Sequence, residues 1–263
     1  MTKISVNGNV LRWVSDRSGL TFNVLEKNFP HFRQWVKETL QPNLKQLERL
    51  AKKTNTPLGY FFLPEPPKEQ LPIPYFRTVG DDGLKSPSPD LLETVYTMQQ
   101  RQEWMREFLI EEGQMALPFV GAAKITDNLK SIANDIRNVL GLENQWAAQH
   151  RTWTAALNDL FHRIEDINIL VVANGVVGNN NYRPLDTEEF RGFVLHDRIA
   201  PLIFLNSTDS KGAQMFTLAH EIAHVWFGSS AAFDLRELQP ANDATEKACN
   251  WVAAEVLVAE NEL

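Results

Sequence analysis

Hydrophobic and polar residues alternate along most of this chain with a period of three to four, which predicts amphipathic helices. In the first third these stretches are short and separated by Gly, Pro and Asn, so we expect a bundle of small helices. Their expected ranges are 9–17, 21–27, 30–40, a segment that begins after Asn43, and 57–62. A longer helix is predicted over 90–112, with an apolar stripe for core or interface packing formed by Leu91, Val95, Met98, Trp104, Met105 and Phe108.

The second half combines helical patterns with short apolar runs that are typical of strands. Helices are expected at 127–140, 150–166, 212–228 and 243–258, and strands at 168–173, 190–196 and 200–206. The last two strands flank Asp197 and Arg198 and are predicted to form a hairpin. These elements predict an α+β fold with a small, mostly antiparallel sheet.

Prolines are concentrated in one segment. Seven of the fourteen prolines lie between Pro64 and Pro89, a density that disfavours helix and sheet. The run 71–77, LPIPYFR, is too apolar for a free tether, so we expect it to pack on the body of the protein. The predicted organisation is a helical domain at 1–65, a linker and amphipathic helix at 66–115, and a larger domain at 116–263.

Charge separates the two ends of the chain. The net charge is −7, but residues 1–65 carry ten Lys or Arg against five Asp or Glu, and the remainder carries sixteen against twenty-eight. A basic module beside an acidic body suggests an acidic partner for the first and a basic partner for the second. With one cysteine, no signal sequence and no apolar run of membrane-spanning length, we expect a cytoplasmic protein.

The most informative motif is HEIAH at 220–224, an H-E-x-x-H pattern within a predicted helix. Residues four apart lie on one helical face, so His220 and His224 are placed to bind one zinc ion. Glu221 would then act as general base on a zinc-bound water, the chemistry of peptide hydrolysis. The flanking residues are apolar nearly all round, and two buried imidazoles beside a buried carboxylate are costly unless a cation pairs with them.

A third zinc ligand is expected in the last helix. Glu246 lies in its first turn, about twenty residues after His224. The alternative is a capping box, because Asp243 stands three residues before it. Asn250 is one turn further along the same face, which suits a supporting role. Cys249 is either near the metal or an inert buried thiol.

Four segments together resemble the ImmA/IrrE family of zinc metallopeptidases. They are FTLAHEIAH at 216–224, TEKACNWVAA at 245–254, EFRGFVL at 189–195 and APLIFLNS at 200–207. Cys249 stands where that family usually has alanine. Upstream, QPNLKQLERLAK at 41–52 and PLGYFF at 57–62 resemble the Xre-type helix-turn-helix domain that precedes many such peptidases.

The resemblance implies a zincin-like (gluzincin) domain and a zinc endopeptidase that cleaves one partner, an Xre-type repressor or antitoxin, in stress response or mobile-element control. Compact zinc peptidases of this kind commonly pair an extended substrate with a sheet edge. The alternative is a DNA-binding regulator or toxin–antitoxin component whose zinc domain is sensory or structural.

Two further sets of residues each have a candidate functional role and a structural alternative. His31, Arg33, Gln34 and Lys37 would contact DNA if the third helix enters a major groove, with protein docking as the rival use. His196 and Arg191 are candidates to stabilise an oxyanion. The structural alternatives are an ion pair for Arg191 and exposure near a turn for His196.

Overall fold

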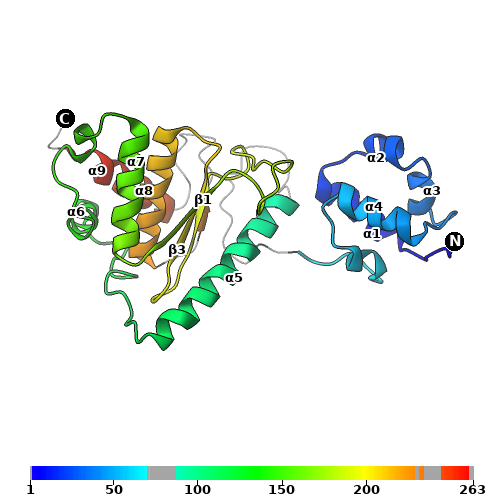
Figure 1. The fold of residues 1–263 in the computed structure, drawn as a ribbon, viewed down its shortest axis with the longest axis horizontal. Coiled ribbons are helices and arrows are strands. Elements are labelled where there is room, and N and C mark those ends of the chain that lie inside the picture. The colour runs from blue at the N-terminus through cyan, green and yellow to red at the C-terminus, as the bar shows by residue number, and fades with distance from the viewer. Residues whose placement is uncertain (1, 70, 72–86, 229–230, 234–243, 261–263) are drawn as a thin grey trace. The chain divides into compact units, whose positions relative to one another are not determined.

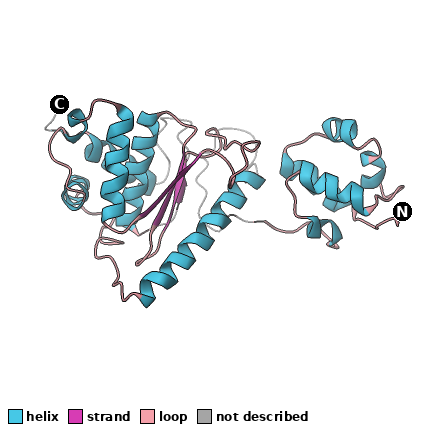
Figure 2. Cartoon of the chain, viewed as in Figure 1, coloured by secondary structure: helices cyan, strands magenta, loops and turns pink. Residues whose placement is uncertain are grey.

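The computed structural model describes residues 2–69, 71, 87–228, 231–233 and 244–260 (Figures 1 and 2). They fall into two compact units, one within Met1–Leu71 and Lys85–Leu92, the other within Pro72–Leu84 and Glu93–Leu263. The fold is mixed helix and sheet, which confirms the α+β prediction. The predicted packing of 71–77 lies outside the described residues, apart from Leu71.

The N-terminal unit is a bundle of short helices around an aromatic core. Its elements are α1 Gly8–Ser18, α2 Phe22–Asn28, α3 Phe32–Val36, α4 Leu44–Lys53 and the 3-10 helix η1 Leu58–Phe62. Asn7, Thr21 and Asn43 cap three of these helices at their N-termini through side-chain oxygens. Phe32 and Trp35 of α3 are fully buried and lie edge to face. The predicted helices are confirmed here, with one change of length.

That change concerns the third helix, which was predicted over 30–40 and is only five residues long. Glu38 adopts a left-handed backbone conformation with φ 59°. Such a conformation interrupts a right-handed helix, since an L side chain there is crowded by its own backbone. Lys37 therefore stands at the C-cap of α3, and His31 is its N-cap residue.

Helix α5, Pro89–Glu111, matches the predicted long helix but not all of its predicted stripe. Leu91, Val95 and Met98 are buried, whereas Trp104 is 65% exposed and Phe108 47% exposed. The two exposed rings stack on each other with centroids 6.2 Å apart. Core packing, one of the two roles predicted for this stripe, therefore holds for Leu91, Val95 and Met98 but not for Trp104 and Phe108.

The second unit is built on a four-stranded sheet with the order β1-β3-β2-β4. The strands are β1 Leu170–Asn174, β2 Gly192–Leu195, β3 Leu202–Asn206 and β4 Ala231–Phe233. β1 pairs with β3 in parallel, while β2 pairs antiparallel with both β3 and β4. This confirms the predicted hairpin and the mostly antiparallel sheet. β4 was not predicted, and it lies against the edge of β2 in the described residues.

Helices cover the sheet. They are α6 Leu129–Val139, η2 Trp146–Gln149, α7 Trp153–Asp166, α8 Lys211–Phe227 and α9 Ala244–Leu257. In Figure 1, α7 and α8 lie on one side of the strands and α5 on the other. Gln102 of α5 donates to the carbonyl oxygens of Leu195 and Ala200, which joins α5 to both ends of the β2–β3 turn.

Helix α8 forms the centre of this core. Residues from Gln214 to Trp226 are buried on nearly every face, and α9 packs along it. Ser210 caps its N-terminus, and Gly228 ends it in a left-handed conformation with φ 71°. A Cβ on Gly228 would lie 3.0 Å from Cα of Gly121, so that position requires glycine for both space and conformation. No described helix is long and apolar enough to cross a membrane.

Candidate metal centre

One turn of α8 brings two imidazoles together. The Nε2 atoms of His220 and His224 are 3.1 Å apart, and the two side chains are 0% and 1% exposed. Because residues four apart stack on one helical face, this contact follows from the spacing in the sequence. The predicted histidine pair therefore converges inside the core.

Helix α9 brings a carboxylate to the same point. Oε2 of Glu246 lies 3.2 Å from Nε2 of His220, and Oε1 lies 3.1 Å from Nε2 of His224. Glu246 is in the first turn of α9 and is buried. The alternative capping role depends on Asp243, which lies outside the described residues. What the structure describes for Glu246 is contact with both histidines.

The side chain of Asn250 contacts the imidazole ring of His220. Its Oδ1 lies 3.0 Å from Nδ1 of His220. With this oxygen as acceptor, Nδ1 would carry the ring proton in a metal-bound form, and Nε2 would be the nitrogen available to a metal. The Asn250 side chain thus has the supporting position that its spacing from Glu246 predicts.

The cluster has the donor set of a metal site. Ring nitrogens of two imidazoles and the oxygens of a carboxylate converge within a buried space, where a bound cation would offset the cost of burying them. Ligand atoms about 2.0–2.2 Å from a tetrahedral zinc ion stand about 3.3–3.5 Å from one another. The separations of 3.1, 3.1 and 3.2 Å come close to this range. The residues present therefore fit a zinc ion.

Protonation equilibria favour the metal-binding forms. Burial lowers the pKa of His220 to about 4, against the opposing effect of its hydrogen bond with Glu246. Burial alone would raise the pKa of Glu246, but hydrogen bonds from His220 and His224 outweigh it and lower the pKa to about 2. At neutral pH, His220 is therefore neutral and Glu246 is charged, as metal ligation requires.

Glu221 stands apart from this set. It is fully buried, and neither carboxylate oxygen has a hydrogen-bond partner among the described residues. Burial, and then the charge of Glu246, raises its pKa well above the usual range. A carboxyl group whose pKa is raised in this way is, once ionised, a stronger base than an ordinary carboxylate.

The two residues considered for oxyanion stabilisation differ in their surroundings. Nη1 of Arg191 lies 2.9 Å from Oδ2 of Asp209. Arg191 therefore forms the ion pair that the sequence analysis gave as its alternative role. His196 follows β2, and its Cε1 would lie 3.5 Å from a Cβ on Gly228, one turn beyond His224. It is partly buried, and burial lowers its pKa. His196 therefore lies beside the C-terminal end of α8. The alternative prediction, exposure to solvent near a turn, was wrong for this residue.

The residues predicted to contact DNA make bonds within their own unit. Nε of Arg33 lies 2.7 Å from Oε2 of Glu26, and its Nη2 donates to Oδ1 of Asn23. His31 and Gln34 are linked through Nδ1 and Oε1 at 3.1 Å. A groove-reading role for Arg33 would require the Glu26 pair to open.

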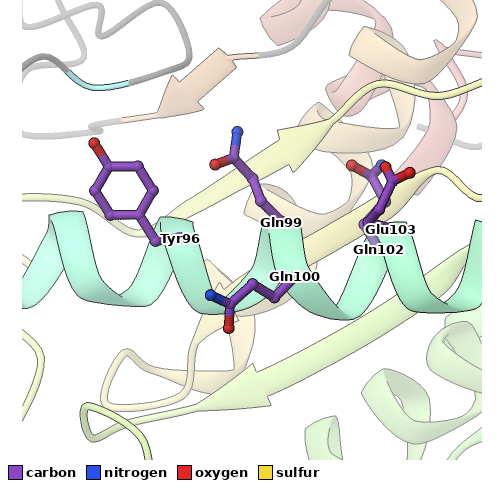
Figure 3. Close-up of a pocket in the computed structure, with 5 residues that line it drawn as sticks. All are labelled: Tyr96, Gln99, Gln100, Gln102 and Glu103. Carbon is purple, nitrogen blue, oxygen red and sulfur yellow. The ribbon is translucent and has the colours of Figure 1, made fainter.

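Among the described residues, a pocket elsewhere in this unit is lined by five residues of α5: Tyr96, Gln99, Gln100, Gln102 and Glu103 (Figure 3). Tyr96 and Gln99 project from one side of the helix and Gln100 from the other. None of these lining residues belongs to the His–Glu cluster, and amides predominate among them. The candidate metal ligands, on α8 and α9, therefore do not line this pocket.

Comparison with known proteins agrees with this site. Residues 166–263, which include β1, the hairpin, α8 and α9, match the Peptidase_M78 family model, described as the IrrE N-terminal-like domain. This match supports the ImmA/IrrE resemblance and a metallopeptidase for that part of the chain. No curated protein and no solved structure was found to match the chain.

Proposed function

We propose that this protein is a zinc-dependent endopeptidase. The observation that carries the proposal is the convergence of His220, His224 and Glu246, with contacts of 3.1–3.2 Å inside the core. These three residues would hold the ion, and Asn250 would keep Nε2 of His220 directed at it. A bound zinc ion supplies a water of lowered pKa and polarises the substrate carbonyl.

Glu221 is the general base in this proposal. Its buried carboxyl, which has no hydrogen-bond partner within the described part of the chain, is adjacent in sequence to His220 and in its ionised form would take a proton from the attacking water. It would then pass that proton to the leaving amine. His196, at the end of α8, is the better placed of the two oxyanion candidates, because Arg191 is paired with Asp209.

The substrate in this proposal is a basic DNA-binding protein of the Xre repressor or antitoxin type, cleaved in stress response or mobile-element control. The supporting observation is charge, since residues 66–263 carry sixteen Lys or Arg against twenty-eight Asp or Glu. A substrate strand would add to the sheet beside β4, through backbone hydrogen bonds.

Incubation of the zinc-loaded protein with Xre-type repressors, followed by mass spectrometry of the products, tests this function. We expect one defined cut with the wild type and none with Glu221→Gln, while zinc content stays the same in both. Cleavage that persists in Glu221→Gln would contradict the role of Glu221.

A second function is proposed for the N-terminal unit, supported by its ten Lys or Arg against five Asp or Glu in residues 1–65. It would bind DNA as an Xre-type helix-turn-helix, or dock on a protein partner, and the metal domain would be sensory. Anisotropy with labelled duplex DNA at increasing salt tests the DNA role. An affinity that falls steeply with salt and is weakened by Lys37→Ala supports it, whereas no binding at low salt opposes it.

A further inference from the structure

Cys249 is the residue near the metal cluster that the proposed mechanism leaves unused. It lies on α9, three residues after Glu246 and next to Asn250, and it is 0% exposed. The donor atoms of Cys249, His220 and His224 all lie within 4.8 Å of one another. This thiol therefore adjoins the imidazole pair and has no access to bulk solvent.

Two sets of three metal donors can therefore form here, and both include the imidazoles of His220 and His224. One adds the carboxylate of Glu246, at 3.1–3.2 Å, and the other adds the thiol of Cys249. Both additional donors come from one face of α9, because positions three apart are neighbours on a helix. An ion beside His220 and His224 can therefore take its third protein ligand from either of these two side chains of α9.

The distances allow direct coordination by sulfur. On a tetrahedral ion, a thiolate at about 2.3 Å and an imidazole at about 2.0 Å stand about 3.5 Å apart. Closing a separation of at most 4.8 Å to that value requires a shift of about 1 Å, which a small change in side-chain torsion provides. Thiolate ligands also favour soft metal ions over hard ones.

We propose that Cys249 is a metal donor in this site, and that thiophilic divalent ions are held by His220, His224 and Cys249. This inference rests on the metal site of the proposed function. On coordination the S–H bond breaks, a metal–sulfur bond forms and the proton goes to solvent, with no change of oxidation state.

Cobalt(II) provides the test, because a thiolate ligand gives cobalt an intense near-ultraviolet charge-transfer band that nitrogen and oxygen ligands do not give. Cys249 is the single cysteine of the chain, so such a band has one source in protein kept in a thiol-free buffer. We expect the band in the wild type and its loss in Cys249→Ala, with the visible ligand-field bands kept in both. Val252→Ala, another fully buried α9 position, is the packing control and should keep the near-ultraviolet band.

Three results separate the possibilities. A band that disappears only in Cys249→Ala supports the proposal. Ligand-field bands without a near-ultraviolet band, alike in wild type and Cys249→Ala, overturn it and leave the peptidase proposal standing. No cobalt uptake by the wild type overturns both.

X-ray absorption of the cadmium-loaded and zinc-loaded wild type needs no variant, and it guards against a Cys249→Ala protein that does not fold. A sulfur shell, at about 2.3 Å for zinc, supports the proposal. First shells made only of nitrogen and oxygen for both metals contradict it.

Discussion

Oδ1 of Asn250 lies 3.0 Å from Nδ1 of His220, which joins α9 to the metal-facing imidazole of α8 across thirty residues of sequence. This contact fixes the tautomer and ring orientation of His220, while its Nε2 is left for a metal. We therefore expect Asn250→Ala to weaken zinc binding about 10- to 100-fold without removing a ligand. Competition with a chromophoric chelator measures this change. Equal affinities for the variant and the wild type would mean that Asn250 does not orient His220.

Removal of the metal should destabilise the second unit. At a free zinc concentration about 100 times its Kd, binding to the folded state adds about 2.7 kcal/mol. For a domain of this size, that amount corresponds to a fall in Tm of about 5–10 °C after chelation. Differential scanning calorimetry with and without chelator measures it. His220→Ala is the control and should not respond to chelator, whereas an unresponsive wild type would contradict a folded-state metal site.

In metal-free protein, Glu221 and His220 should give stability opposite dependences on pH. The pKa of His220 is lowered to about 4, so its contribution is present above about pH 6.5 and is lost as pH falls toward 4. The pKa of Glu221 is raised, so its contribution is present below about pH 4.5 and is lost as pH rises toward its folded pKa.

Glu221→Gln removes the second of these effects alone. We expect chelated Glu221→Gln to gain stability over chelated wild type as pH rises from about 4.5 to 8, and to differ by a constant amount below 4.5. Urea denaturation at several pH values gives the comparison. A constant difference across the whole range would show that Glu221 titrates normally in the folded protein.

Substitution at the end of α8 should be costly. Gly228→Ala places a Cβ 3.0 Å from Cα of Gly121 and forces an L side chain to φ 71°, so we expect a loss of at least about 1–2 kcal/mol. Gly212→Ala, within α8 and with open space around its Cβ, should be neutral or stabilising by up to about 1 kcal/mol. Midpoints of urea unfolding compare the two, and equal effects would contradict the steric argument.

Much of the site could be predicted from sequence because its parts are local. The H-E-x-x-H spacing places His220 and His224 on one helical face whatever surrounds the helix, and Glu246 and Asn250 stand one turn apart for the same reason. The approach of α9 to α8 is a tertiary contact. For that reason the sequence could place Glu246 and Cys249 on α9 but could not fix their separation from the imidazoles.

The failed predictions have equally specific causes. Trp104 is nine residues after Val95, which turns it about half a revolution to the opposite face of α5, so a count of apolar residues overstated the buried stripe. Strand β4 has three residues, too few for a periodic pattern. The early end of α3 depends on the backbone of Glu38, a residue type that does not itself indicate a left-handed conformation.

The most direct test of the metal centre is the metal content of protein purified without chelator or metal-affinity resin, measured by plasma mass spectrometry beside His220→Ala and Glu246→Ala. We predict about one zinc ion per wild-type chain, less than a tenth of that in His220→Ala, and a large reduction in Glu246→Ala. A wild-type protein that carries no metal and takes up none when zinc is added would contradict the assignment of His220, His224 and Glu246 as a metal site.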